Sequence, residues 1–153
     1  MPGSAPKLGT GVVAGLAGTF AMTAFQRLVE MPVTGRTESE APLTLAMKLL
    51  PLHPKGDRQR RQVNYVAHFV VGSAWGVARA VAGRAGLRGQ QAVAAVFAAM
   101  WTGDVLGVAA LGLDEPPWRW ERRDLAIDVI DKLVLAEAIG LIYARLEGDR
   151  AGG

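Results

Sequence analysis

The chain has no cysteine among its 153 residues, and its only histidines are His53 and His68. Without thiols it can form no disulfide, no thiolate metal site and no cysteine nucleophile. A haem held by two histidines would need His53 to reach from a loop to a membrane helix. The sequence contains no HExxH, phosphate-loop or Ser-His-Asp pattern, and no Glu-x-x-His pair for a di-metal site. We therefore expect a protein that is not an enzyme and that holds no metal and no cofactor.

Charged residues are also scarce, at 20% of the chain, whereas 50% of the residues are hydrophobic. The charges gather in short Arg-rich blocks between long uncharged runs, which is typical of a multi-pass membrane protein. A net charge of +3 could indicate nucleic acid, but the basic residues flank hydrophobic runs and form no separate basic domain. We expect these residues to contact the anionic head groups of the lipid bilayer, and we expect no nucleic-acid partner.

Four stretches have the length that a bilayer crossing requires. The first is uncharged from Leu8 to Phe25 and continues as an amphipathic helix through Glu30, which favours a membrane helix over a signal peptide. The third contains a single ionisable residue, Asp104, near its middle. The fourth is marginal by hydropathy because it contains several charges. The predicted crossings are about 8–29, 62–83, 91–113 and 124–146.

The sequence thus predicts an all-α integral membrane protein, with a single membrane domain over residues 1–153 built as a four-transmembrane-helix bundle. The long first loop, residues 31–61, contains an apolar stretch in which Pro42 occupies the first turn of a short predicted helix. That helix would lie at the membrane interface, or pack as an ordinary loop helix on the end of the bundle.

Charge asymmetry gives an expected orientation. Seven Lys and Arg residues between Arg27 and Arg61, with three between Arg119 and Arg123, lie on one side, against five on the other. The excess of positive charge on cytoplasmic loops in membrane proteins then predicts that the Arg-rich loops are cytoplasmic.

Three crossings each contain a GxxxG pair, a pattern that lets helix backbones approach closely. The pairs either pack helices within one chain or contact a partner, which would be a second copy in a homo-oligomer or another protein of a membrane complex. These helix-packing residues are Gly11 and Gly15, Gly72 and Gly76, and Gly103 and Gly107.

Polar residues of all four crossings fall in the half of the membrane next to the Arg-rich loops, and helical spacing places them on inward faces. We predict a pocket open to that side, with Asp104 near its floor and Lys132 paired with Asp128 at i, i+4 spacing. A remaining carboxylate would need His68, Arg27 or a proton as its partner. The predicted pocket residues are Arg27, Asn64, His68, Asp104, Asp128, Asp131 and Lys132.

Two functions are consistent with such a pocket. It could respond to protons or ions, since intramembrane ionisable residues commonly mark functional sites. Alternatively, its charges form only a structural network, and the protein is an accessory subunit that packs through its GxxxG faces in a larger membrane complex.

The order of several motifs suggests a relative. The first crossing ends in VEMPVTGR with Glu30, Pro32 and Arg36. The second carries His68 near its start, and LGLDEPPW precedes the fourth. In this order and spacing the chain resembles the family of small bacterial inner-membrane proteins typified by YagU, a domain of unknown function. The acidic fourth helix departs from that pattern. The resemblance implies a multi-pass protein of the bacterial plasma membrane with no assigned biochemistry.

Overall fold

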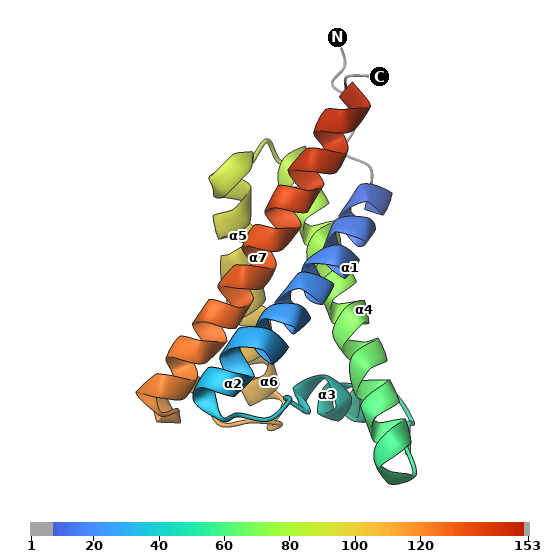
Figure 1. Ribbon diagram of the computed structural model, residues 1–153, viewed down its shortest axis with the longest axis vertical. Helices are drawn as coiled ribbons and strands as arrows, with labels where there is room; N and C mark the ends of the chain where they lie inside the picture. Colours follow the sequence, from blue (N-terminus) through green and yellow to red (C-terminus); the bar gives the residue numbers. More distant parts are fainter. Residues whose placement is uncertain (1–7, 152–153) are drawn as a thin grey trace.

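The computed structural model describes residues 8–151, and the side chains of residues 8–148. All regular elements of this part of the chain are helical, so the all-α prediction is confirmed there. Four long helical segments run between two ends (Figure 1). We call the end that carries residues 35–55 and 111–121 the loop end, and the end with the short connection at residues 85–88 the turn end.

The first long segment comprises α1 (Leu8–Phe25), the π-helical η1 (Gln26–Glu30) and α2 (Met31–Thr34). It continues five residues beyond the predicted end at residue 29. In η1 the Met31 N–H donates to the Gln26 carbonyl, and this wider turn precedes Pro32, whose ring would clash with a carbonyl in a regular α-helix. Gly35 ends the segment in the left-handed conformation (φ 71°), and its N–H donates to the Met31 carbonyl at 2.8 Å.

The second and fourth segments begin earlier than predicted. α4 (Gly56–Arg84) starts six residues before residue 62, and α7 (Arg122–Ala151) extends beyond 124–146 at both ends. Hydropathy marks where the apolar stretch ends, but Arg, Gln and Glu are good helix formers and continue the helix into the charged blocks. At the start of α4, Asp57 favours the first turn, and the Lys55 N–H donates to Gln59 Oε1 at 2.7 Å.

The third segment consists of α5 (Gly89–Trp101), the π-helical η2 (Thr102–Leu106) and α6 (Gly107–Ala110), and it ends three residues before the predicted 113. The chain leaves the helix through Gly112, which has φ 70°. The Leu113 N–H donates to the Val108 carbonyl at 3.1 Å, the long hydrogen bond of a helix terminated by a left-handed glycine.

Short helices cover the loop end. α3 (Ala41–Leu49) has Pro42 in its first turn and packs against α4, with Leu43 fully buried. The 3₁₀ turn η3 (Pro117–Arg119) precedes α7. The short helix of the first loop is therefore packed on the bundle. Side chains described below join the connection before it to the long helices.

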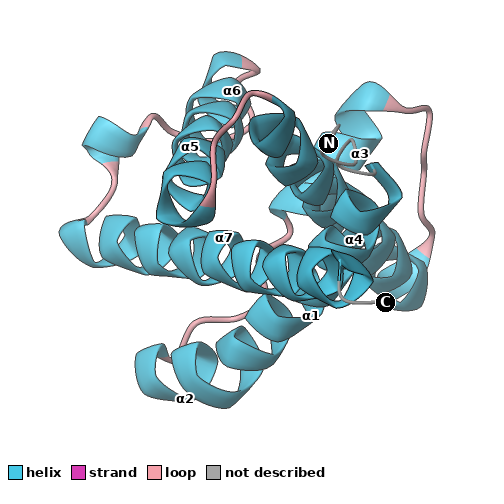
Figure 2. Ribbon diagram, turned by 90° about the horizontal axis from the view of Figure 1, so that it is seen from above, coloured by secondary structure: helices cyan, strands magenta, loops and turns pink. Residues whose placement is uncertain are grey.

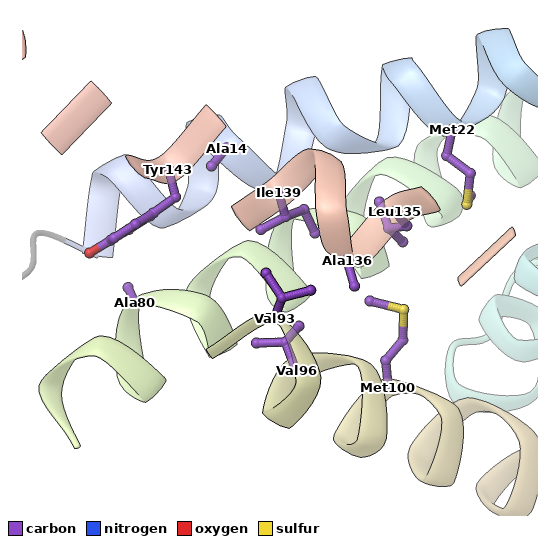
Figure 3. Close-up of a cluster of buried hydrophobic side chains, with 10 residues drawn as sticks. All are labelled: Ala14, Met22, Ala80, Val93, Val96, Met100, Leu135, Ala136, Ile139 and Tyr143. Carbon is purple, nitrogen blue, oxygen red and sulfur yellow. The ribbon is translucent and has the colours of Figure 1, made fainter. Parts of the chain in front are cut away.

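α7 lies between α1 and α5, while α4 packs against α1 and α5 (Figure 2). The hydrophobic core fills the half of the bundle toward the turn end. There Val93, Val96 and Met100 of α5 face Ala136 and Ile139 of α7 (Figure 3). Apolar residues thus close this half of the bundle.

The closest helix contact is between α1 and α4. A β-carbon at Gly11 would lie 2.5 Å from the Gly76 carbonyl oxygen, and one at Gly15 would lie 2.5 Å from that of Gly72. Two of the three GxxxG pairs therefore face each other within the chain. The third does not pack helix on helix: a β-carbon at Gly103 would meet only Trp75, and Gly107 has nothing within 4 Å.

Three segments are long and apolar enough to cross a membrane: Leu8–Thr34, Gly56–Arg84 and Gly89–Ala110, with mean hydropathies of 1.5, 1.2 and 1.7. The chain is thus a helical bundle with the composition of a membrane protein. α7 does not meet the same criterion within its described residues.

Candidate functional site

Two adjoining cavities lie at the loop end. The main cavity has a volume of about 420 Å³ and is lined from all four long segments and both connecting loops. The side cavity, of about 80 Å³, lies between η1, residues 36–39 and α4. Five residues line both cavities and join them into one polar region: Gln26, Arg36, Ser39, His68 and Asp131.

Each of the seven predicted pocket residues lines at least one cavity. Asp104, Asp128 and Lys132 line the main cavity. Arg27 and Asn64 line only the side cavity. His68 and Asp131 line both.

One face of α7 supplies most of the charge, because residues three and four apart on a helix share a face. Lys132 Nζ donates to Asp128 Oδ1 at 2.5 Å, and the two side chains are 16% and 22% exposed. Asp131 Oδ2 accepts from Gln26 Nε2 at 2.8 Å. A neutral amide thus holds the place at Asp131 for which the sequence suggested Arg27 or His68.

Two carboxylate oxygens in the lining of the main cavity are buried without a hydrogen-bond partner among the described residues: Asp128 Oδ2 and Asp131 Oδ1. Buried acceptors of this kind are costly unless something donates to them. Each of the two carboxylates therefore has one oxygen bonded and one oxygen without a donor.

Asp104 reaches the main cavity from η2, the second π-helical segment of the bundle. Among the described residues it forms no ion pair within 4.0 Å, unlike Asp128. The Trp75 ring lies beside it in the fold, since its Cη2 is 3.4 Å from where a Gly103 β-carbon would be. Asp104 is a carboxylate next to an aromatic ring and without a cationic partner.

His68 lies where the two cavities meet. Its Nε2 is 3.4 Å from Thr23 Oγ1, and which atom donates depends on the histidine tautomer. Its ring packs edge-on against Phe69, with centroids 6.1 Å apart.

The partners of Arg27 and Asn64 lie in the first loop and not among the carboxylates of α7. Arg27 Nη2 pairs with Glu38 Oε1 at 2.5 Å, and its side chain is 53% exposed. Its partner is thus a residue of the first loop and not a carboxylate of α7. Asn64 binds the first loop: its Oδ1 accepts from the Leu43 N–H at 2.9 Å, and its Nδ2 donates to the Ser39 carbonyl at 3.0 Å.

Three residues that the predicted set leaves out belong to the site. Gln26 and Trp75 line the main cavity, and both had the helical spacing that would have placed them inward. Glu38 binds Arg27 and also accepts from the Tyr65 hydroxyl. No periodic pattern identifies Glu38, because it lies in an irregular loop.

Within residues 8–151, no three or more His, Asp or Glu side chains are grouped to hold a metal ion. Comparisons with protein-family models, curated proteins and solved structures find no match to this chain. Function is therefore inferred from the geometry of the two cavities.

Proposed function

We propose that the chain is a non-enzymatic, multi-pass protein of the bacterial plasma membrane whose four helices enclose a one-sided pocket that takes up protons or cations. The Arg-rich loops lie on the cytoplasmic side in this proposal. The observation that carries it is the main cavity, to which Asp104, Asp128 and Asp131 all contribute from the loop end.

Four crossings require α7 to span the bilayer despite its charges. Its support is the distribution of polarity around the helix. Asp128, Asp131 and Lys132 line the cavity, whereas its exposed large hydrophobic residues lie on other faces. These are Ile130, Leu133 and Leu141, which are 49%, 44% and 59% exposed. A helix with polar residues inward and apolar residues outward is suited to lipid contact.

A proton is the simplest ligand for the available oxygens of Asp128 and Asp131, because both atoms are buried and a proton needs no space. Whether one of these carboxylates takes up a proton depends on the charged groups near it. Asp104 is influenced by Lys132 and Asp128. Asp131 is influenced by Glu30, Asp128 and Lys132, and His68 by Glu38. One proton added to this group changes the balance between its carboxylates and its single lysine.

Such a change in charge can act on the helices. Gln26 and Asp104 both lie in π-helical segments, the local widenings that occur frequently at functional sites. Each segment joins two α-helical parts and carries a residue of the main cavity. Protonation at Asp131 or Asp104 would therefore alter the contacts of both widened turns.

The turn-end half of the bundle supports uptake without conduction. The hydrophobic core fills it, and Arg79, 6% exposed, lies over the Tyr143 ring at 4.6 Å. Glu137 accepts a hydrogen bond from Gln90 Nε2 at 3.1 Å at that end. None of these groups lines either of the two cavities at the loop end, so a sensor is favoured over a channel.

Infrared difference spectroscopy of the chain in lipid nanodiscs tests the proposal, because it detects protonated carboxyl groups directly. We expect a carboxyl band to grow as the pH falls, because the carboxylates of the cavity then take up protons. Asp131→Asn and Asp104→Asn should diminish the band. Glu137→Gln is the matched control, because it removes a carboxylate of α7 outside the cavity.

Identical difference spectra for the wild type, Asp131→Asn and Asp104→Asn would refute proton uptake at this site. A pH-sensitive dye inside proteoliposomes tests the second part of the proposal. Proton flux into the vesicles would show that the pocket conducts and would contradict the assignment as a sensor.

One observation favours the alternative, an accessory subunit of a larger membrane complex. Gly103 of the third GxxxG pair is exposed and meets only the Trp75 ring, Gly107 has nothing within 4 Å of where its β-carbon would be, and Ala99 one turn before Gly103 is also exposed. Gentle-detergent mass measurement with cross-linking should then show a complex that Ala99→Phe disrupts. A strictly monomeric chain would contradict this alternative.

Assignment to the YagU-type family belongs to the same proposal. Of the residues that carry the resemblance, Glu30, Arg36 and His68 all line the side cavity. Membrane fractionation of bacterial cells that express the chain tests the localisation, and recovery outside the inner membrane would contradict it.

A further inference from the structure

The main cavity is far larger than a proton or a single metal ion requires. Its volume of about 420 Å³ lies in the range of roughly 300–1,000 Å³ that is typical of small-molecule sites. It is reached from the loop end, where Arg36, Asp114 and Asp124 contribute to its lining. The space suggests an organic ligand.

The charge of the lining selects the sign of that ligand. Five carboxylates line the main cavity against two cationic side chains, Arg36 and Lys132. Both cations are already engaged: Lys132 with Asp128 at 2.5 Å, and Arg36 with Asp124 at 3.9 Å. The carboxylates without an ion pair among the described residues are Asp104, Asp114 and Asp131. An anion would be repelled, whereas a cation would complete the pairing.

Another part of the lining is apolar and aromatic. Trp75 lies beside the η2 segment that carries Asp104, and a tryptophan ring attracts organic cations. The aliphatic side chains around them are Met22, Leu45, Val71, Val105, Val108 and Leu135. A small inorganic cation would leave these side chains without a partner, but a hydrocarbon group would cover them.

We propose that the main cavity binds an organic ammonium ion with an apolar body. The ammonium group pairs with Asp104, and the apolar body packs against Trp75 and the aliphatic lining. This inference rests on the proposed function, in that the same carboxylates exchange protons and the ligand. Because protons and the cation compete for these carboxylates, binding weakens as the pH falls.

The test uses the full chain in phosphatidylglycerol nanodiscs, whose lipid carries no ammonium group, and calorimetric titration with 2-phenylethylammonium, with empty nanodiscs of the same lipid as the blank. This probe joins an ammonium group to an aromatic body. The control ligand is 3-phenylpropanoate, which is similar in size but has the opposite charge. We expect saturable binding of the first and none of the second. Tetramethylammonium, which has the charge without the body, should bind at least about tenfold more weakly, since each buried CH₂ contributes about 0.8 kcal/mol.

Variants locate the site. Asp104→Asn should weaken binding on the order of a hundredfold, the effect of one charge about 6 Å away at an effective dielectric constant near 20. Trp75→Leu should weaken it about 2- to 30-fold, and Trp75→Phe by less, since phenylalanine keeps an aromatic face. Glu137→Gln is again the control and should leave binding unchanged.

The outcomes separate this inference from the proposed function. A carboxyl band that responds to pH, together with no saturable probe binding, would overturn the organic ligand and leave proton uptake standing. Probe binding that Asp104→Asn and Trp75→Leu both leave unchanged would also overturn it. Probe binding lost in both variants supports it. Adding phosphatidylethanolamine then identifies the natural source: a lipid ammonium displaces the probe, and a free amine is indicated if it does not.

Discussion

At the scale of single residues, two carboxylates of α7, Asp128 and Asp131, are each satisfied on one oxygen only. Asp128 Oδ1 has Lys132 and Asp131 Oδ2 has Gln26, while the other oxygen of each is buried and unpaired. A buried acceptor left without a donor reduces stability, so the bundle holds these groups at a cost. They are the atoms at which a proton or an ammonium group has most to gain.

The Gln26–Asp131 hydrogen bond gives the first prediction. Gln26→Leu should lower the free energy of unfolding by about 1–3 kcal/mol, because it leaves a buried carboxylate without its donor. Adding Asp131→Leu should recover most of that loss, since both polar groups are then absent. SDS titration monitored by circular dichroism measures Gln26→Leu, Asp131→Leu and the double variant. If the double variant loses the sum of the two single losses, the hydrogen bond contributes nothing.

A second prediction concerns Arg79 and Tyr143. The Tyr143 hydroxyl is buried without a partner among the described residues, so Tyr143→Phe should leave stability unchanged or raise it. Tyr143→Leu should be destabilising beyond its loss of packing, because the cation–π contact contributes about 0.5–2 kcal/mol. The same SDS titration in an Arg79→Met background isolates that part: the cost of Tyr143→Leu should be smaller there. An unchanged cost would contradict the contact.

Residue positions were predictable where helical periodicity governs them. The spacing of Asp128, Asp131 and Lys132 places them on one face of α7, and they lie on one face in the structure. Arg27 was assigned to the pocket by depth alone, but Glu38 of the loop draws it to the side cavity. Loop contacts have no period in sequence, so neither Glu38 nor the role of Asn64 in holding the loop could be read from it.

At the scale of elements, the close approach of α1 and α4 depends on glycine. Gly15→Ala should lower the free energy of unfolding by about 1–3 kcal/mol, because its β-carbon would overlap the Gly72 carbonyl and force the helices apart. Gly107→Ala is the matched control. Nothing lies within 4 Å of that position, so alanine should be neutral or stabilise the helix by up to about 1 kcal/mol. Equal effects in an SDS titration would mean that the contact between the two helices is not close.

The segment of residues 36–49 at the loop end gives a prediction of its own. The Asn64 side chain holds the backbone of this segment with two hydrogen bonds, accepting one from the Leu43 N–H and donating one to the Ser39 carbonyl. Asn64→Ala removes both, and amide hydrogen exchange in this segment should become faster, since exchange follows local opening. Asn64→Asp keeps the acceptor for the Leu43 N–H and should have the smaller effect. Peptides from residues 84–92 at the turn end provide the internal control and should not change.

Element boundaries were less predictable than element type. Hydropathy located three segments well, but it placed the start of α4 at residue 62, where the apolar stretch begins, and not at Gly56, where the helix begins. The first crossing was predicted to end near residue 29, but the helix continues past Pro32 to Thr34. The π-helical turn of η1 accommodates this proline, and such a turn depends on backbone hydrogen bonds that no side-chain pattern specifies.

At the scale of the whole molecule, apolar and polar parts occupy opposite halves. The hydrophobic core and the glycine contacts hold the turn-end half together, which leaves room for cavities at the loop end. This division also explains why hydropathy identifies three crossings and not α7. An average over a stretch of sequence counts Asp128, Asp131 and Lys132 against membrane insertion, although these side chains face a cavity.

The absence of native cysteine makes the number of crossings directly testable by single-cysteine labelling in spheroplasts. Exposed sites are available at both ends of the bundle: Thr37 and Glu115 in the connections of the loop end, Ala85 in the connection of the turn end, and Gly148 near the end of α7. With four crossings and cytoplasmic loops, a membrane-impermeant maleimide should label Ala85→Cys and Gly148→Cys in intact spheroplasts. It should label Thr37→Cys and Glu115→Cys only after lysis.

The two variants that flank α7 decide the fold in the membrane. If Gly148→Cys shows the same accessibility as Glu115→Cys and the opposite accessibility to Ala85→Cys, α7 does not cross the membrane. The main cavity then loses the wall that supplies Asp128 and Asp131. If all four accessibilities are reversed, only the orientation is wrong, because a reversed bundle encloses the same cavity. The pocket would then open to the outside of the cell, and any organic cation it binds would be taken from there.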